Sequence, residues 1–142
     1  MRLPKIHFSK WNHYCDFSIF KDGVQFPGVY LVAHFDQPPR DRARTAAREI
    51  VYIGETCNNS LRGRWNQFRR SALKGRREHS GGMRYYKKFR NKKKYKRLLH
   101  VAVFPVNLPK KVICAFFTRY VERKLLLDYA IKWGKAPKCN ER

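Results

Sequence analysis

Acidic residues and long apolar runs are scarce in this sequence of 142 residues. Only 10 side chains are Asp or Glu, against 33 Lys and Arg, so the formal net charge at pH 7 is +23. No apolar run reaches the roughly 18 residues that a membrane-spanning helix needs. The first residues, M-R-L-P-K-I-H, lack the apolar stretch of a signal peptide. These absences predict a cytoplasmic protein with no membrane partner, associated with the nucleoid if its source is a bacterium.

Cysteine is also rare, and its spacing is uninformative. The four cysteines are Cys15, Cys57, Cys114 and Cys139, and none belongs to a C-x-x-C pair. The long, irregular gaps argue against a structural zinc site. Free thiols in a reducing compartment are the expected state.

The hydrophobic content is that of a folded protein. It amounts to 43% of the residues, including 15% aromatic residues, so the chain is more than a basic tail. The length predicts one domain spanning residues 1–142, with residues 1–25 as an N-terminal extension packed on it. Aromatic residues about three positions apart indicate a helical or irregular packing face in this extension: Phe8, Trp11, Tyr14, Phe17 and Phe20.

The excess of positive charge predicts a polyanionic partner, and nucleic acid is the first candidate. Contacts from basic side chains to phosphates provide affinity without reading the base sequence. The basic residues expected to bind nucleic acid are Arg62, Arg69, Arg70, Arg84, Lys87, Lys88, Arg90, Lys92 and Lys93.

The stretch from residue 50 to residue 68 predicts a strand, a turn and a helix. Ile50 to Ile53 is a short β-branched and aromatic run, and Gly54 is expected to end it. Asn59 or Ser60 can cap a helix over residues 60–74. One apolar face of this helix is formed by Leu61, Trp65, Phe68 and Ala72.

The remaining elements follow from similar patterns. Strands are predicted at 26–35, 49–54 and 98–104, and further helices at 83–91 and 111–133. Between residues 74 and 82 lies a basic, glycine-containing loop. The order β-β-α-α-β-α predicts an α/β fold with a small three-stranded, mainly antiparallel sheet flanked by helices.

Two tripeptides within the predicted strands resemble the motifs of one nuclease family. Residues 28–30 read G-V-Y, and residues 52–54 read Y-I-G. With the residues that follow in order, this set resembles the GIY-YIG nuclease family over residues 26–140. The following residues are Arg64, His79, Glu122 and Asn140.

The resemblance implies a DNA endonuclease that depends on Mg²⁺ or Mn²⁺. Glu122 would hold the metal, one of Tyr30 and Tyr52 would act as general base, and Arg64 would grip the scissile phosphate. His79 would shuttle a proton or contact a phosphate, its neighbouring glycines letting backbone amides approach the anion. Gly54 and Asn140 would brace the site.

The chemistry of these residue types suits phosphodiester hydrolysis. The reaction requires a proton acceptor, neutralisation of the phosphoryl charge and alignment of the reacting groups. A guanidinium can bind a phosphate through two parallel hydrogen bonds, and one carboxylate can suffice to anchor a largely hydrated Mg²⁺. The helical stripe of Thr118, Glu122, Leu125 and Tyr129 turns Glu122 partly toward the core.

Two positions depart from the family pattern. Phe68 stands where a Tyr or His is often found, which removes a polar helper. Glu55 stands where some members carry Lys, and it is either a second acid near the site or the partner of an arginine.

The alternative to a nuclease is a non-catalytic, basic nucleic-acid-binding protein associated with RNA or the ribosome. For a nuclease, duplex and branched DNA remain equal candidates as substrate, and no small-molecule cofactor is expected. Specificity could come from the chain itself, a homodimer or a partner protein.

Overall fold

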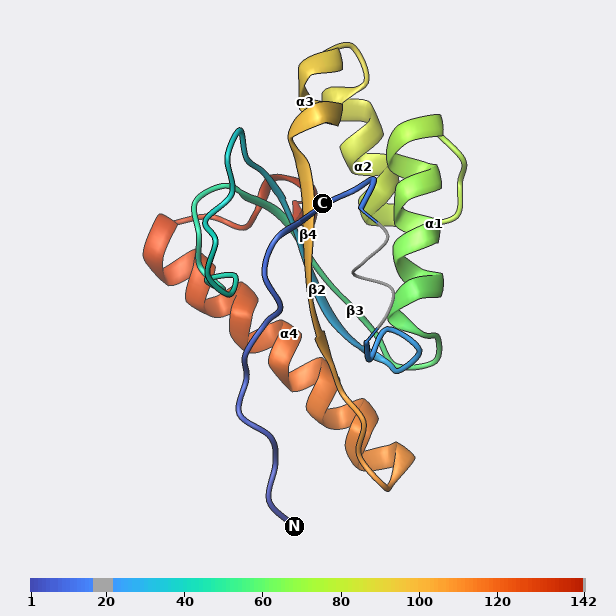
Figure 1. Cartoon of the computed structure of the whole chain (residues 1–142), viewed down its shortest axis with the longest axis vertical. Helices are drawn as coiled ribbons and strands as arrows, with labels where there is room; N and C mark the ends of the chain where they lie inside the picture. Colours follow the sequence, from blue (N-terminus) through green and yellow to red (C-terminus); the bar gives the residue numbers. More distant parts are fainter. Residues whose placement is uncertain (17–21, 142) are drawn as a thin grey trace.

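A four-stranded sheet with helices on both faces forms the centre of the molecule. This computed structural model describes residues 1–16 and 22–141. The strands are β1 (Asn12–His13), β2 (Gly28–His34), β3 (Ile50–Thr56) and β4 (Leu99–Pro105). The helices are α1 (Leu61–Lys74), α2 (Ser80–Phe89), α3 (Lys93–Leu98) and α4 (Lys111–Trp133), followed by the 3-10 turn η2 (Lys138–Asn140). Figure 1 shows α1 and α2 on one face of the sheet and α4 on the other.

The predicted α/β class is confirmed, but the expectation of three strands is wrong. All strand pairs are antiparallel, in the order β1-β4-β2-β3. The additional strand β1 has two residues and pairs with β4. Its sequence is too short to display a strand period, so only pairing with a distant segment defines it. The additional helix α3 has six residues, four of them basic, and is too short to display a helical period in the sequence.

The N-terminal extension is extended rather than helical in its described part. Phe8 and Trp11 are buried and join the core on the α4 face of the sheet. Tyr14 instead packs at the margin of the opposite core. Two of the aromatic residues in the predicted face, Phe17 and Phe20, lie outside the described residues.

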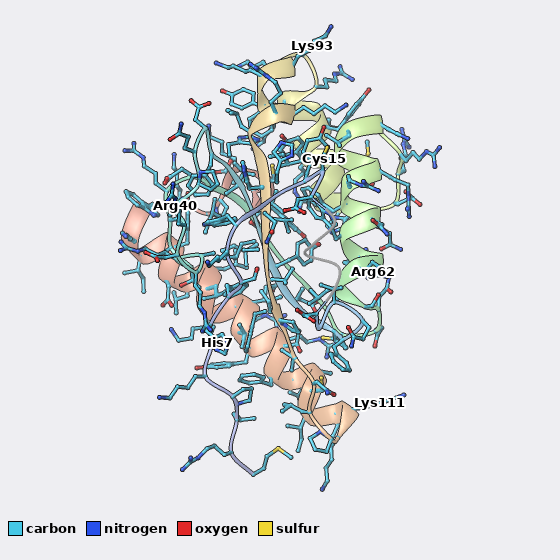
Figure 2. The ribbon with its side chains drawn as sticks, viewed as in Figure 1. His7, Cys15, Arg40, Arg62, Lys93 and Lys111 are labelled. Atoms are coloured by element: carbon cyan, nitrogen blue, oxygen red, sulfur yellow. The ribbon has the colours of Figure 1, made fainter. Side chains whose placement is uncertain are left out.

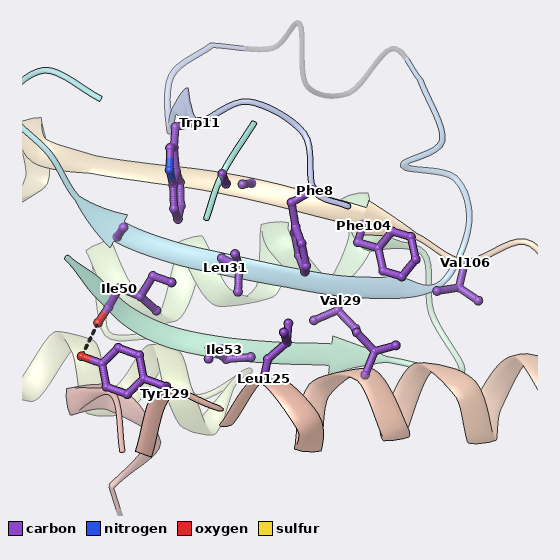
Figure 3. Packing of buried hydrophobic residues seen from close by; sticks show 14 of the residues in the cluster. Phe8, Trp11, Val29, Leu31, Ile50, Ile53, Phe104, Val106, Leu125 and Tyr129 are labelled. Atoms are coloured by element: carbon purple, nitrogen blue, oxygen red, sulfur yellow. Dashed lines mark hydrogen bonds between the residues drawn. The ribbon is translucent and has the colours of Figure 1, made fainter. Parts of the chain in front are cut away.

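Strand alternation divides the side chains of β2 and β3 between two cores. Val29, Leu31 and Ile53 belong to the core beneath α4, which Figure 3 shows from close by. Tyr30 and Tyr52 belong to the core beneath α1 and α2. The antiparallel register pairs Tyr30 with Gly54 and Val32 with Tyr52, so both tyrosines point to one face.

Two helix starts position the site. Ser60 caps α1, its Oγ accepting a hydrogen bond from the Gly63 amide at 3.0 Å. The predicted apolar face of α1 is buried. The second helix begins earlier than predicted because the His79 side chain caps it, its Nδ1 accepting from the Gly82 amide at 3.2 Å.

Two long-range features hold α4 and the chain end. Tyr129, near the end of α4, places its hydroxyl 3.4 Å from the Arg48 carbonyl oxygen and 3.5 Å from that of Ile50, the contact drawn in Figure 3. Gly134 ends α4 with a positive φ of 75°, a conformation that glycine adopts without strain. Among the described helices, none has the length and apolar character needed to cross a membrane.

Candidate active site

Tyr30 and Tyr52 form the centre of the candidate site. Their ring centroids lie 5.9 Å apart on the face of the sheet that α1 and α2 cover. Tyr30 is fully buried, whereas 8% of Tyr52 is exposed. The tyrosine of β3 is therefore the one nearer to solvent and to any substrate.

Gly54 provides the room that the two rings occupy. A Cβ at this position would lie 2.5 Å from Tyr52 Cε2 and 2.6 Å from Tyr30 Cζ. These separations are too short for real contacts, so a larger residue would displace one of the rings. Gly54 does not end the strand as predicted, since β3 continues to Thr56. Its position supports the expected bracing role by steric means.

The glycines after His79 are packing residues of the first turn of α2. A Cβ on Gly81 would overlap Tyr52 Cε1 and lie 2.9 Å from Tyr52 Oη. A Cβ on Gly82 would lie 2.7 Å from the Phe68 carbonyl oxygen of α1. The predicted loop, with glycines that let backbone amides approach a phosphate, is wrong at this point, because both glycines are buried within a helix.

His79 holds Tyr30 in place. Only 3% of the residue is exposed, and its Nε2 lies 2.5 Å from Tyr30 Oη. Because Nδ1 accepts the Gly82 amide, a neutral ring carries its proton on Nε2 and donates it to Tyr30. Burial lowers the pKa of His79 to about 3, and the positive charges of Arg64 and Arg84 act in the same direction. The neutral, enclosed ring is placed to orient Tyr30 rather than to contact a phosphate at the surface.

The two phenols differ in how easily they ionise. Burial raises the pKa of Tyr30 well above its ordinary value. Burial also raises the pKa of Tyr52, to about 12, with the negative charge of Glu122 contributing. The nearby guanidiniums of Arg64 and Arg84 lower the pKa of Tyr52.

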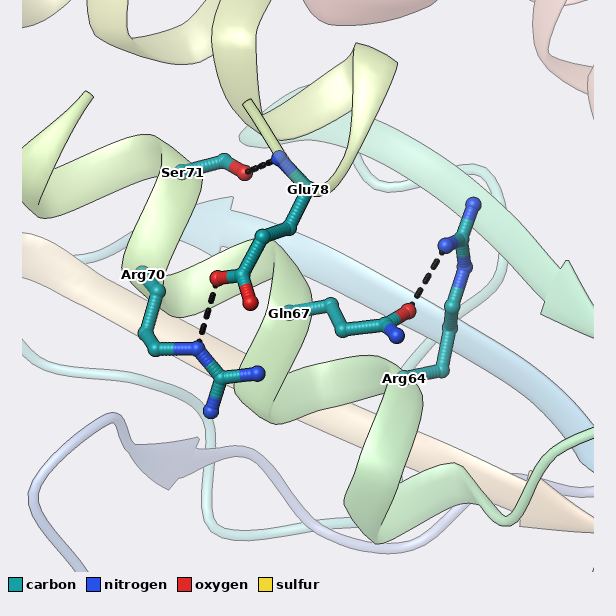
Figure 4. Close-up of polar contacts among 5 residues, drawn as sticks. All are labelled: Arg64, Gln67, Arg70, Ser71 and Glu78. Carbon is teal, nitrogen blue, oxygen red and sulfur yellow. Dashed lines mark hydrogen bonds and ion pairs between the residues drawn. The ribbon is translucent and has the colours of Figure 1, made fainter. Parts of the chain in front are cut away.

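Arg64 is the arginine of α1 that reaches this cluster. It is half-buried, and its Nη1 donates to Gln67 Oε1 at 2.8 Å (Figure 4). Arg70, in contrast, is committed to Glu78 at 2.6 Å. Arg62, two residues before Arg64, is exposed. Arg64 has no carboxylate partner among the described residues, so its charge remains available for an anionic ligand.

Glu122 approaches the same place from α4. It is half-buried, and the predicted stripe is confirmed, since Thr118, Leu125 and Tyr129 are buried. Burial raises the pKa of Glu122 to about 7, and the negative charge of Glu55 contributes in the same direction. In the described part of the chain, no group of three or more His, Cys, Asp or Glu side chains could hold a metal ion.

Glu55 is a second acid near Glu122. Its Oε2 accepts a hydrogen bond from the Cys57 thiol at 3.0 Å. The same thiol lies 3.5 Å from the Ala115 carbonyl oxygen, which ties the end of β3 to α4. Glu55 forms no ion pair with an arginine among the described residues. Of the two roles left open by the sequence, the structure favours the second acid.

Asn140 closes the open edge of β3. Its Oδ1 accepts the Ile53 amide at 2.9 Å, and its Nδ2 donates to the Ile53 carbonyl at 2.9 Å. The side-chain amide thus takes the place of a neighbouring strand beside the Y-I-G residues. The residues after α4 form an ordered turn, η2, and its last residue, Asn140, is held against β3 by these two hydrogen bonds.

Arg84 was expected at a general nucleic-acid-binding surface but lies at the wall of the site. Its Nε donates to the Cys139 carbonyl at 2.6 Å, and its charge lowers the pKa values of Tyr52 and His79. This placement was missed because Gly81 was predicted to lie in a loop before a helix at 83–91. In the structure both residues lie in α2, three positions apart and therefore neighbours on one helix face.

The other predicted nucleic-acid-binding residues are more dispersed. Lys88 donates to the Lys138 carbonyl and lies 3.5 Å from Glu141. Figure 2 shows Lys93 at the α3 end of the molecule, far from Arg62 at the start of α1. Half-buried positions are occupied by Arg69 and Arg70, and exposed ones by Arg62, Lys87, Lys88, Arg90, Lys92 and Lys93.

Comparison with protein-family models, with curated proteins and with solved structures returned no match to this chain.

Proposed function

We propose that this chain is a GIY-YIG-type endonuclease that hydrolyses DNA with the help of a divalent metal ion. The observation that carries the proposal is the convergence of distant residues at one edge of the sheet. Tyr30 and Tyr52 come from β2 and β3, Arg64 from α1, His79 from the start of α2 and Glu122 from α4. A protein that only binds nucleic acid has no need of a half-buried carboxylate that lacks an ion pair among the described residues and lies near enough to Tyr52 to raise its pKa.

The donor set fits a hard divalent cation such as Mg²⁺ or Mn²⁺. Glu122 would hold the ion, and Glu55 adds negative charge beside it. Burial and this like charge make an ionised Glu122 costly in the metal-free protein, and a bound cation would relieve that cost. Mg²⁺ retains most of its water ligands, so few protein ligands are needed. When bound, the ion supplies charge neutralisation for the phosphoryl oxygens and the leaving group.

Tyr52 is the better candidate for the general base. Tyr30 accepts the His79 Nε2–H inside the core, whereas Tyr52 is the more exposed of the two phenols. The positive charges of Arg64 and Arg84 favour the ionised form of Tyr52. Neutralisation of Glu122 would remove a charge that raises the pKa of Tyr52. Tyr30 and His79 are positioning residues because both are enclosed.

Arg64 supplies the phosphate contact. Its guanidinium can form two parallel hydrogen bonds with the scissile phosphate and hold it against the Tyr52 hydroxyl. Gln67, which accepts from Nη1, fixes the side chain on α1 (Figure 4). Alignment of this kind accounts for much of the acceleration in phosphoryl chemistry.

The test is cleavage of supercoiled plasmid DNA with Mg²⁺ or Mn²⁺ and with EDTA. We expect metal-dependent nicking that Glu122→Gln abolishes, with DNA binding nearly unchanged because the substitution adds no bulk. Arg123→Gln, at the next residue, is the control for a changed charge on α4. The non-catalytic alternative would be supported if the protein binds DNA but does not cleave it under any metal condition. Its affinity should then still fall by about 0.9 log units per phosphate contact for each tenfold rise in salt.

A further inference from the structure

Arg84 is a half-buried arginine with no carboxylate partner among the described residues. The chain contains more than three basic side chains for each acidic one, so most arginines are unpaired. Most of the others near this face are exposed, however, or engaged as Arg70 is with Glu78. A guanidinium that lies at the wall of a site without a compensating carboxylate is suited to binding an anionic ligand.

The geometry of α2 directs Arg84 toward Tyr52. Gly81 packs so closely on the Tyr52 ring that a Cβ there would be 2.9 Å from Tyr52 Oη. Arg84 lies one helical turn further along the same face, about 5–6 Å away. The Cys139 carbonyl accepts from Nε at 2.6 Å, and neither Nη nitrogen has a hydrogen bond among the described residues. The guanidinium is thereby anchored at Nε, and its two Nη groups can still donate to an anion.

Arg64 reaches the same hydroxyl from the other helix. Both arginines lower the pKa values of Tyr52 and His79, so their charges lie close to the same two side chains. Phe68, the residue of α1 that stacks on Tyr52 at a centroid distance of 5.3 Å, contributes no polar group. The first helix therefore supplies one cationic group to the site, and α2 supplies the second.

We propose that Arg84 is a second catalytic arginine, which together with Arg64 clamps the phosphate that reacts beside Tyr52. The identity of this phosphate as a DNA phosphodiester rests on the function proposed above. Two guanidiniums, one from α1 and one from α2, stabilise the negative charge of the phosphoryl oxygens and fix the phosphate against the Tyr52 hydroxyl. This role differs from that of the exposed lysines, which contribute affinity without contacting the reacting group.

The experiment compares Arg84→Ala and Arg84→Lys with Arg76→Ala, an exposed arginine in the α1–α2 connection. We expect Arg84→Ala to lower the single-turnover cleavage rate at saturating DNA by about 10²–10³-fold, as loss of one preorganised donor does. Arg84→Lys keeps the charge but loses the fork, so it should also be impaired. Arg76→Ala should retain the wild-type rate. Added guanidinium at low millimolar concentration should restore part of the Arg84→Ala activity.

A second measurement does not depend on catalysis. Titration of the wild-type protein with inorganic phosphate, followed by calorimetry, should give an affinity that Arg84→Ala reduces by about tenfold or more. If the wild type cleaves DNA and Arg84→Ala behaves like Arg76→Ala in both assays, the inference is wrong and the proposed function stands. If no DNA is cleaved but phosphate binding requires Arg84, the anion site stands and the proposed function fails.

Arg84 also contacts Cys139, so a purely structural role must be distinguished. In that case Arg84→Ala and Arg84→Lys would lower the melting temperature, and guanidinium would not restore activity. This combination would overturn the inference. If Arg84→Ala does not fold, Arg84→Lys is used in its place in both assays, because the charge and length of lysine preserve much of the packing.

Discussion

The two faces of the sheet differ in what their buried side chains do. On the α4 face, Val29, Leu31 and Ile53 pack against apolar side chains such as Leu125. On the α1–α2 face, the intervening Tyr30 and Tyr52 pack against His79, Phe68 and buried glycines. Alternate residues of one strand therefore stabilise the fold on the α4 face and provide polar groups on the α1–α2 face. The effect of a substitution should depend on its face more than on its burial.

The largest effect is expected for Tyr52→Phe on the polar face. Loss of a positioned proton acceptor lowers the rate by about 10²–10⁴-fold. The ring and its stacking on Phe68 remain, so the stability should change by only about 1 kcal/mol, the value of one neutral hydrogen bond. Single-turnover cleavage and urea denaturation of the same preparation measure both quantities. A wild-type rate would place Tyr52 among the packing residues.

Leu31→Ala tests the opposite face. Leu31 is fully buried between Tyr30 and Val32 in β2. Its truncation should reduce the free energy of unfolding by about 2–5 kcal/mol through lost burial and the cavity left behind. The folded fraction should cleave at the wild-type rate, which activity corrected for the folded population will measure. A large loss of specific activity in folded protein would show that the two faces are not separable.

Tyr30→Phe should affect both properties to an intermediate extent. The change leaves the buried Nε2–H of His79 without its acceptor. An unsatisfied buried donor costs about 1–3 kcal/mol, so this variant should be less stable than Tyr52→Phe. Its rate should also fall, since His79 no longer fixes the ring that lies beside Tyr52. Equal melting temperatures for the two variants would contradict donation from His79 to Tyr30.

Acid should destabilise the polar face before the apolar one. Burial lowers the pKa of His79 to about 3 and that of His34 to about 4. Below about pH 6.5 the unfolded histidines take up protons that the folded ones do not, so stability falls from pH 6.5 toward pH 4. The raised pKa of Glu122 has the opposite effect, because the folded protein binds this proton more readily than the unfolded one. Only one group acts in this direction, against two histidines. Unfolding free energies at pH 7 and pH 4.5 measure the slope, and His34→Gln should make it shallower.

The local pattern of the sequence was enough to predict several elements. The repeats of apolar residues every three to four positions predicted the helices now seen at Leu61–Lys74 and Lys111–Trp133. The short β-branched runs predicted β2, β3 and β4, which pair antiparallel in the structure with Tyr30 and Tyr52 on one face. These features depend on residues close in the chain, whose spacing reflects which face of an element is buried.

Only the tertiary structure determined how the site is assembled. His79 meets Tyr30 across 49 positions, Arg84 meets Cys139 across 55, and Asn140 meets Ile53 across 87. No local period records such contacts. The same is true of the early start of α2, which depends on the His79 cap, and of β1, whose two residues are a strand only because they pair with β4. The difference in burial between the two tyrosines arises in the same way, because the helix that covers Tyr30 is distant in the sequence.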